Sequence, residues 1–305
     1  MSSGIVAPVA PARAWLLAAR PATLPAAAVP VLVGTAAAVS EGARLRPVVF
    51  ATTLVCALLI QIGTNFANDY SDFHRGADHE GRLGPVRVTQ SGLISQSDVR
   101  RGIVVAFGLA VLLGAALALI GGWPIVVIGV LSVLSGLAYT GGPFPFGYHG
   151  LGELFVFVFF GVVAVCGAAY LQLGTWNGFA LALSLPIGLL VTNILLVNNL
   201  RDLPTDRAAG KRTLAVRIGE RATRLQYAAF TALAYIVPTV LAVSERSRRW
   251  LLLPLFTLPL AAGLARRVLG KLAGRELNPM LKHTGQLLML FGILLALALV
   301  LGRAA

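Results

Sequence analysis

The chain has 305 residues, of which 57% are hydrophobic and 12% charged, and its mean hydropathy is +0.82. This composition excludes a soluble globular protein and indicates one embedded in a membrane. The net charge of +13 would also suit a nucleic-acid-binding protein. However, the Lys and Arg residues lie in short loops beside apolar segments, where anionic lipid and a diphosphate explain them better. We therefore expect membrane lipid as a partner and no nucleic acid.

Nine membrane-spanning helices are predicted, because a span needs about 20 consecutive apolar residues. The candidate stretches lack Asp, Glu, Lys and Arg, and they cover residues 21–40, 47–68, 102–152, 154–200, 225–244, 250–265 and 284–302. The two long stretches must each divide where Gly, Pro and Trp mark a turn, at Gly121 to Pro124 and at Gly174 to Gly178. The expected fold is all-α: a polytopic membrane protein formed by residues 1–305 as a single domain.

The orientation follows from the basic residues, which collect in the cytoplasmic loops of membrane proteins. With the N-terminus inside, 19 of the 25 Lys and Arg residues fall on the cytoplasmic side, mainly in the loops 69–101, 198–225 and 266–283. We therefore predict an N-in, C-out protein of the cell membrane. The loops 69–101 and 198–225 then carry an active site that faces the cytoplasm.

Two acidic clusters lie at the predicted cytoplasmic ends of apolar stretches, from Asn65 to Asp78 and from Asn198 to Thr213, and hold five of the twelve acidic residues. Crowding acids beside membrane segments needs a compensating partner. Asn68 and Asp72 are four residues apart, as are Asp202 and Asp206, so each pair would share one face of a helix. Oxygen ligands of this kind suit Mg²⁺, which usually takes further ligands from water and phosphate.

The two clusters are related by a faint internal repeat. The segment from Asn68 to Asp72 can be laid over the segment from Asn198 to Asp202, and each follows a helix that runs from outside to inside. Parallel repeats would place the clusters face to face across a central cavity. Basic residues lie in or just after both clusters: Arg75, Arg82 and Arg87 at the first, and Lys211 and Arg212 at the second. Metal ions and cations at the mouth of a helical bundle predict an isoprenoid diphosphate as substrate.

Several candidate residues have a plainer alternative reading. Asp69 and Asp78 could cap a helix or pair with a loop Arg. Tyr139 could belong to an interfacial aromatic belt, or it could stabilise a cation in the cavity. Glu153 could pair with an Arg, although its isolation in an apolar stretch favours a position facing the cavity. Tyr139 and Glu153 are therefore the candidate catalytic residues.

The pattern N-D-x-x-D in one loop and D-x-x-x-D in another resembles the UbiA-type superfamily of intramembrane aromatic prenyltransferases, which have nine helices around a central cavity. Residues 61–92, 139–161 and 198–219 narrow the resemblance to the branch that acts on 1,4-dihydroxy-2-naphthoate, and residues 19–34 and 277–286 extend it over nearly the whole chain. The common first motif has an Asp four residues after Asp72. Here the next acid is Asp78, a longer spacing that resembles the naphthoate branch.

The resemblance implies which residues bind what. Magnesium would be held by Asn68, Asp69, Asp72, Asp202 and Asp206. Diphosphate oxygens would be bound by Arg75, Lys211 and Arg212. Apart from the resemblance, the carboxylate of the acceptor needs a cation, for which Arg87 and Lys282 are the candidates.

The resemblance also implies the reaction. A polyprenyl group passes from polyprenyl diphosphate to dihydroxynaphthoate with loss of carbon dioxide, which gives a demethylmenaquinone. Other members of the superfamily use homogentisate, 4-hydroxybenzoate or haem as acceptor, and these remain alternatives. A membrane transporter is the alternative outside the superfamily, because acids within the membrane and parallel repeats also mark ion pathways.

Overall fold

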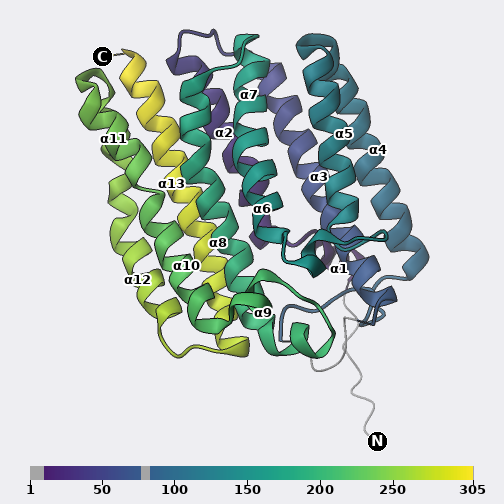
Figure 1. The fold of residues 1–305 in the computed structure, drawn as a ribbon. Coiled ribbons are helices and arrows are strands. Elements are labelled where there is room, and N and C mark those ends of the chain that lie inside the picture. The colour runs from purple at the N-terminus through teal and green to yellow at the C-terminus, as the bar shows by residue number, and fades with distance from the viewer. Residues whose placement is uncertain (1–9, 77–82, 305) are drawn as a thin grey trace, which may run out of the picture.

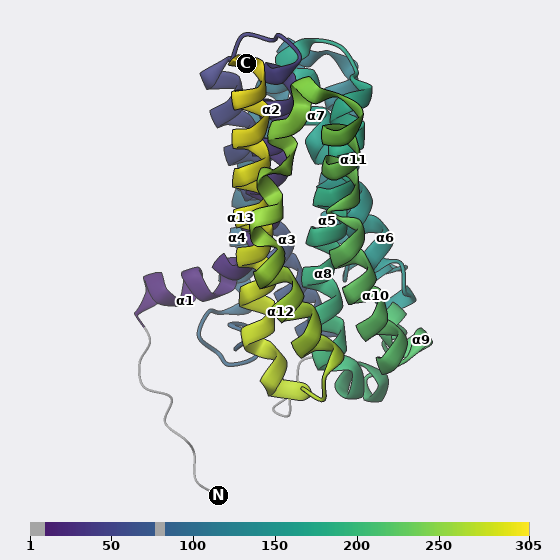
Figure 2. The ribbon, with the colours of Figure 1, turned by 90° about the vertical axis from the view of Figure 1, so that its left-hand side faces the viewer.

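A computed structural model describes residues 10–76 and 83–304, and in these two ranges it contains helices and loops and no strand. The helices stand side by side as an elongated bundle (Figures 1 and 2). In chain order the α-helices are α1 Pro11–Ala19, α2 Pro25–Ser40, α3 Pro47–His74, α4 Gln96–Gly121, α5 Trp123–Ala138, α6 Gly152–Val156, α7 Ala164–Leu173, α8 Gly178–Ala208, α9 Leu214–Ile218, α10 Glu220–Leu233, α11 Ile236–Ser244, α12 Leu258–Leu269 and α13 Asn278–Ala304. The short helices of other types are η1 Pro21–Thr23, η2 Phe146–His149, η3 Phe157–Val163, η4 Arg246–Thr257 and η5 Gly274–Leu277.

Seven helices of the described chain are long and apolar enough to cross a membrane, by length and composition. They are Pro47–His74, Gln96–Gly121, Gly152–Leu173, Gly178–Ala208, Glu220–Ser244, Ser247–Leu269 and Gly274–Arg303. An eighth span arises if the segments Pro11–Thr23 and Pro25–Ser40, which meet at a bend of 52°, are counted as one. The apolar helix α5 is shorter, at 16 residues. The chain is therefore a multi-pass helical membrane protein.

The two predicted breaks in the long apolar stretches are confirmed, and local chemistry explains both. Gly122 has a φ of 69° and ends α4, and Pro124 stands in the first turn of α5, where its missing N–H costs nothing. Gly174 has a φ of 78° and ends α7. The side chain of Asn177 then caps α8 by accepting a hydrogen bond from Ala180 N at 2.9 Å.

Helix α8 lies at the centre of the main hydrophobic core, with α2, α7, α10, α12 and α13 around it. Inside a membrane, apolar side chains gain little by leaving lipid for protein, because both surroundings are apolar. Helices therefore associate through close packing, which small residues allow. Gly34 of α2 is one such residue: a Cβ there would lie 2.2 Å from the carbonyl oxygen of Val165 in α7. The fold holds together through this kind of contact between backbones.

The span that begins with α6 contains a seven-residue π-helix, η3, between α6 and α7. Such segments are rare and are frequent at functional sites. Gly161 of η3 packs against Gly188 of α8, where an added Cβ would lie 2.6 Å from the Cα of Gly188. This contact fixes the start of the span, which carries Glu153, next to α8.

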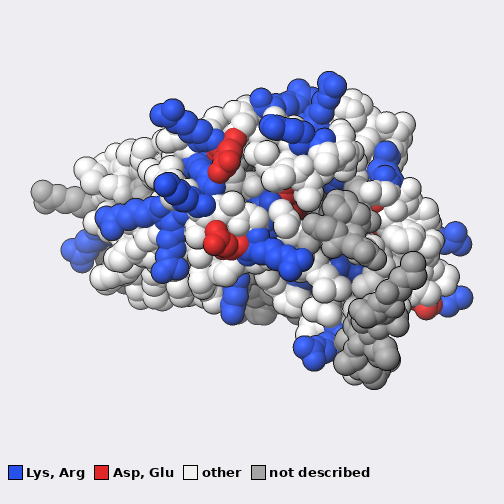
Figure 3. Space-filling view, turned by 90° about the horizontal axis from the view of Figure 1, so that it is seen from below, with Lys and Arg blue, Asp and Glu red and all other residues white. Residues whose placement is uncertain are grey.

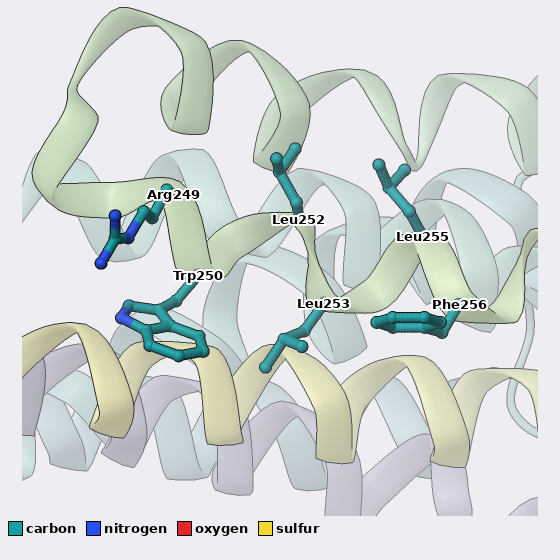
Figure 4. A pocket seen from close by; sticks show the side chains of 6 residues that line it. All are labelled: Arg249, Trp250, Leu252, Leu253, Leu255 and Phe256. Carbon is teal, nitrogen blue, oxygen red and sulfur yellow. The ribbon is translucent and has the colours of Figure 1, made fainter.

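The ends of the bundle differ in character. The C-terminal ends of α3 and α8 lie at the lower end in Figure 1, and the C-terminal end of α13 lies at the upper end. Lys and Arg side chains crowd the lower face (Figure 3). Along η4, an apolar hollow of about 360 Å³ is lined by Arg249, Trp250, Leu252, Leu253, Leu255 and Phe256 (Figure 4). Among the described residues, none of the predicted site residues borders this hollow. The C-terminal ends of α3 and α8, which carry the two acidic clusters, lie at the lower end instead.

Candidate active site

The first acidic cluster occupies the last turns of α3, inside the helix rather than in the loop after it. Asn68 is 8% exposed, and Asp69 and Asp72 are each 2% exposed. Asn68 accepts a hydrogen bond through its Oδ1 from the hydroxyl of Thr140 at 2.8 Å. Asp78 lies outside the described residues. The cluster is thus a buried polar end to a long apolar helix.

Asp72 is the centre of the cluster. Its Oδ2 accepts a hydrogen bond from Nη2 of Arg87 at 2.8 Å. Its Oδ1 accepts one from the hydroxyl of Tyr148 at 2.8 Å and one from Nζ of Lys211 at 3.3 Å. Two cations therefore stabilise one buried carboxylate, and one of them, Lys211, comes from the loop after α8, within the second acidic cluster.

Asp69 binds the backbone of the loop that follows α3. One of its carboxylate oxygens accepts a hydrogen bond from Val88 N at 3.2 Å, and the other accepts one from Thr89 N at 3.0 Å. These bonds fix the residues next to Arg87 and so help to hold its guanidinium at Asp72. The plainer alternatives for Asp69 are a helix cap or a pair with a loop Arg, and the contacts found among the described residues are instead with backbone N–H groups of a loop. A metal role for Asp69 stays a prediction.

The second cluster lies in the last turns of α8. Both carboxylate oxygens of Asp202 accept hydrogen bonds from the guanidinium of Arg201, at 2.8 Å and 2.6 Å. Arg201 is 1% exposed and also donates to the side-chain oxygens of Asn198 and Asn278. Asp206, one turn later, accepts a hydrogen bond through its backbone oxygen from Lys211 N at 2.9 Å. That bond helps to fix the start of the loop that sends Lys211 back to Asp72.

Tyr139 and Glu153 lie between the clusters. Burial, together with the negative charges of Glu153, Asp72 and Asp206, raises the pKa of the Tyr139 hydroxyl above its ordinary value. Glu153 is 5% exposed and accepts a hydrogen bond through Oε1 from Asn199 at 2.9 Å. Its Oε2 is buried and has no hydrogen-bond partner in the part of the chain that the structure describes. The structure thus pairs Glu153 with an amide of α8, and not with an Arg.

The remaining basic candidates divide into two kinds. Arg75 donates a hydrogen bond to the backbone oxygen of Gly142, and its guanidinium carbon lies 5.6 Å from the centre of the Tyr148 ring. The side chain of Arg212 is exposed, and its backbone N–H donates to the oxygen of Tyr148 at 2.9 Å. Arg75 therefore lies beside the cluster around Asp72, whereas among the described residues Arg212 contacts this region through its backbone and its side chain is exposed.

Two residues of the site were missed by the sequence reasoning. Tyr148 contacts Asp72 from a position 76 residues away, and no spacing rule connects them. The stretch 139–161, on which part of the family resemblance rests, contains Tyr148 and could have drawn attention to it. Arg201 was counted as one more loop cation, although it stands beside Asp202 in a helix.

The oxygen donors at this site fit a magnesium ion that takes some of its ligands from the protein and the rest from a phosphate and water. Within residues 10–76 and 83–304, no three His, Cys, Asp or Glu side chains converge closely enough to hold a metal ion by themselves. Mg²⁺ typically binds through one or two carboxylates and takes substrate phosphates and water for the rest. Asp72, with Asn68 one turn away on the same helix face, offers oxygen donors beside the cations that a diphosphate needs.

Together, these observations define a class of protein: a multi-pass helical membrane protein whose buried acidic and basic side chains meet at one end of an apolar bundle. Residues 27–284 match the UbiA prenyltransferase family, and the chain belongs to that family. The resemblance inferred from the two acidic motifs is thereby confirmed.

Relatives support this assignment over nearly the full chain, and a solved structure is similar in fold. The 1,4-dihydroxy-2-naphthoate octaprenyltransferase of Mycobacterium tuberculosis is 40% identical over 292 residues, covering 95% of this chain and 97% of that one. The enzyme of the same name from Escherichia coli is 36% identical, covering 96% and 97%. A UbiA homologue from Archaeoglobus fulgidus, solved with DMAPP and Mg²⁺ bound, superposes with a TM-score of 0.66 at 18% identity, covering 95% and 98%. That structure shares the fold of this chain.

Proposed function

We propose that this chain transfers a polyprenyl group from polyprenyl diphosphate to 1,4-dihydroxy-2-naphthoate, with loss of carbon dioxide, as a step of menaquinone biosynthesis. The observation that carries the proposal is the similarity, over at least 94% of the chain, to enzymes named for this acceptor, at 32% to 40% identity. The meeting of Asp72 with cations from two different loops supports a diphosphate as the second substrate.

The site residues of this proposal divide by charge. Mg²⁺ would be held by oxygens of Asn68, Asp72, Asp202 and Asp206, with Asp69 as a further candidate. When bound, Mg²⁺ would neutralise the negative charge that develops on the departing diphosphate. The diphosphate would be bound by Arg75 and Lys211, the two candidate cations that lie at the Tyr148 ring, with Arg212 available from the exposed side of the same loop.

The reaction forms one bond and breaks two. The allylic C–O bond of the prenyl diphosphate breaks, and the diphosphate leaves with the electron pair toward Lys211 and Arg75. The ring carbon that carries the carboxylate attacks the allylic carbon, and carbon dioxide then leaves that ring carbon, so the product is demethylmenaquinone in its quinol form. Tyr139 contributes an aromatic face, and Glu153 a buried carboxylate, on the path between the two clusters.

We further propose the membrane arrangement as nine spans, with the bent helix at α2 and the short helix α5 each crossing once. The N-terminus would then be cytoplasmic and the C-terminus outside, and the single domain 1–305 would lie in the cell membrane with its active site facing the cytoplasm. The crowding of Lys and Arg on the lower face supports this orientation (Figure 3).

A membrane assay with dihydroxynaphthoate, a polyprenyl diphosphate and Mg²⁺, read by product mass, tests the proposal. We expect a prenylated product that has lost the mass of carbon dioxide. Parallel reactions with 4-hydroxybenzoate and homogentisate are the acceptor controls, and a series of donors sets the preferred chain length. Prenylation of one of those acceptors in place of dihydroxynaphthoate would overturn the assignment of the acceptor. Ion flux in proteoliposomes without any prenyl transfer would overturn the proposal that the protein is a prenyltransferase.

A further inference from the structure

We propose that Tyr148 is a positioning residue that holds the Asp72 carboxylate ready for Mg²⁺ and holds Lys211 and Arg75 ready for the diphosphate. The inference rests on the proposed function and deepens it. The segment 139–151 joins α5 to α6 and contacts both the helix of the first acidic cluster and the loop after α8.

Tyr148 lies in this segment and is held from two sides, by α3 and by the loop after α8. Its hydroxyl donates to Oδ1 of Asp72 at 2.8 Å, on α3. Its backbone oxygen accepts a hydrogen bond from Arg212 N at 2.9 Å, in the loop after α8. The chain following Tyr148 is held as closely, because a Cβ at Gly150 would lie 2.8 Å from the side chain of Arg217. One residue therefore links the helix of the first cluster to the loop of the second.

The ring of Tyr148 also contacts two cations. Lys211 Nζ lies 4.5 Å from the ring centre, and the guanidinium carbon of Arg75 lies 5.6 Å from it. Cations at these distances are attracted by the negative face of an aromatic ring. Two long, flexible side chains are thus held near Asp72, one from each cluster. Among the described residues, Lys211 pairs with no carboxylate besides Asp72, and Arg75 bonds to a backbone oxygen, so both cations lie where phosphate oxygens could reach them.

The hydroxyl and the ring should therefore affect different steps. A residue that bonds to a metal ligand from outside orients that ligand, and its loss typically costs 10- to 100-fold in metal affinity. Removing the hydroxyl alone, as in Tyr148→Phe, should weaken Mg²⁺ binding by about tenfold and leave the ring contacts in place. Removing the ring as well, as in Tyr148→Leu, should also weaken diphosphate binding by about fivefold at saturating Mg²⁺.

The test measures binding of an unreactive prenyl thiolodiphosphate to purified protein in nanodiscs, as a function of Mg²⁺ concentration, by titration calorimetry. For Tyr148→Phe we expect a roughly tenfold higher Mg²⁺ requirement and unchanged analogue affinity once Mg²⁺ is saturating. Combining Tyr148→Phe with Asp72→Asn should cost no more than Asp72→Asn alone, because the hydroxyl then has no carboxylate to orient.

Tyr170→Phe is the matched control. Its hydroxyl also donates one hydrogen bond, to the oxygen of Gly121 at 3.0 Å, at the end of α4 far from the clusters. If the Tyr148 hydrogen bond only stabilised the fold, Tyr148→Phe would lower the unfolding temperature, as Tyr170→Phe can, and would leave the Mg²⁺ requirement unchanged. That result would overturn the inference. If the unsubstituted protein bound no prenyl diphosphate analogue with Mg²⁺, the proposed function itself would fail.

Discussion

Asp69 and Asp72 lie three residues apart in α3, yet the structure predicts different consequences for replacing them with Asn: mainly a loss of activity at Asp72 and mainly a loss of stability at Asp69. Asp72 is paired with two cations at the point where diphosphate would bind. Asp72→Asn keeps the size of the side chain and removes its charge. A metal-clamped diphosphate contributes several kcal/mol to the transition state, so we expect a loss of activity of a hundredfold or more, which is about 2.7 kcal/mol.

Asp69→Asn should instead affect mainly stability. In the unsubstituted protein, the backbone N–H groups of Val88 and Thr89 each donate to a different oxygen of the Asp69 carboxylate. The Asn amide offers one acceptor oxygen, and its NH₂ group would face the second N–H donor. Leaving one buried donor unsatisfied costs about 1–3 kcal/mol. We expect a lower unfolding temperature in detergent and, below that temperature, an activity loss smaller than for Asp72→Asn.

Asp98→Asn is the control for both variants. Asp98 lies in the first turn of α4, its side chain is 47% exposed, and its partner Arg101 is 78% exposed. Exposed pairs of this kind contribute little, so activity and unfolding temperature should stay near those of the unsubstituted protein. Equal activity in Asp72→Asn and Asp98→Asn would refute the site. A rise in the Mg²⁺ requirement of Asp69→Asn to match Asp72→Asn would instead make Asp69 a metal ligand.

Three further predictions follow from the chemistry, the orientation and the packing. Chelation should abolish turnover, and Mg²⁺ should restore it where Zn²⁺ does so poorly, because the proposed ligands are all oxygen; full activity in excess chelator contradicts this. In a cysteine-free background, Cys at Ser97 and Arg207 should react with an impermeant reagent only from the cytoplasmic side, and Cys at Ser247 only from the other, whereas the reversed pattern would invert the topology. Gly34→Ala should destabilise the bundle by about 1–3 kcal/mol, because its Cβ would lie 2.2 Å from a backbone oxygen of α7, while Gly108→Ala, with open space around it, should leave the unfolding temperature nearly unchanged.

The parts of the fold that sequence predicted are those set by local chemistry. The two breaks in the apolar stretches were predictable because Gly at positive φ and Pro in a first turn act within a few residues. The number of spans was harder to predict. Helix α5 has 16 residues, and the first apolar stretch bends by 52° against the helix before it, so length alone does not decide whether either one crosses. Both depend on how neighbouring helices pack, which the hydropathy pattern does not encode.

The candidate site shows the same division. Buried positions of Asn68 and Asp72 on one face of α3 follow from their spacing of four residues. The contact of Tyr148 with Asp72 does not, because it depends on how the segment 139–151 folds back across the bundle. Glu153 is an intermediate case: its isolation in an apolar stretch predicted a position facing the cavity, whereas the fold shows it buried with Asn199 as its partner.

The charge balance of the clusters changes the reason for expecting a metal. From sequence, the acids near the membrane called for a divalent ion as their compensating partner. The structure gives Asp72 the cations Arg87 and Lys211, and it gives Asp202 the buried Arg201. The protein's own cations thus balance these two carboxylates, and charge compensation alone requires no metal. The case for Mg²⁺ rests instead on the diphosphate, whose negative charge would compete with Asp72 for Lys211, so that Asp72 would be one of the residues that hold the ion.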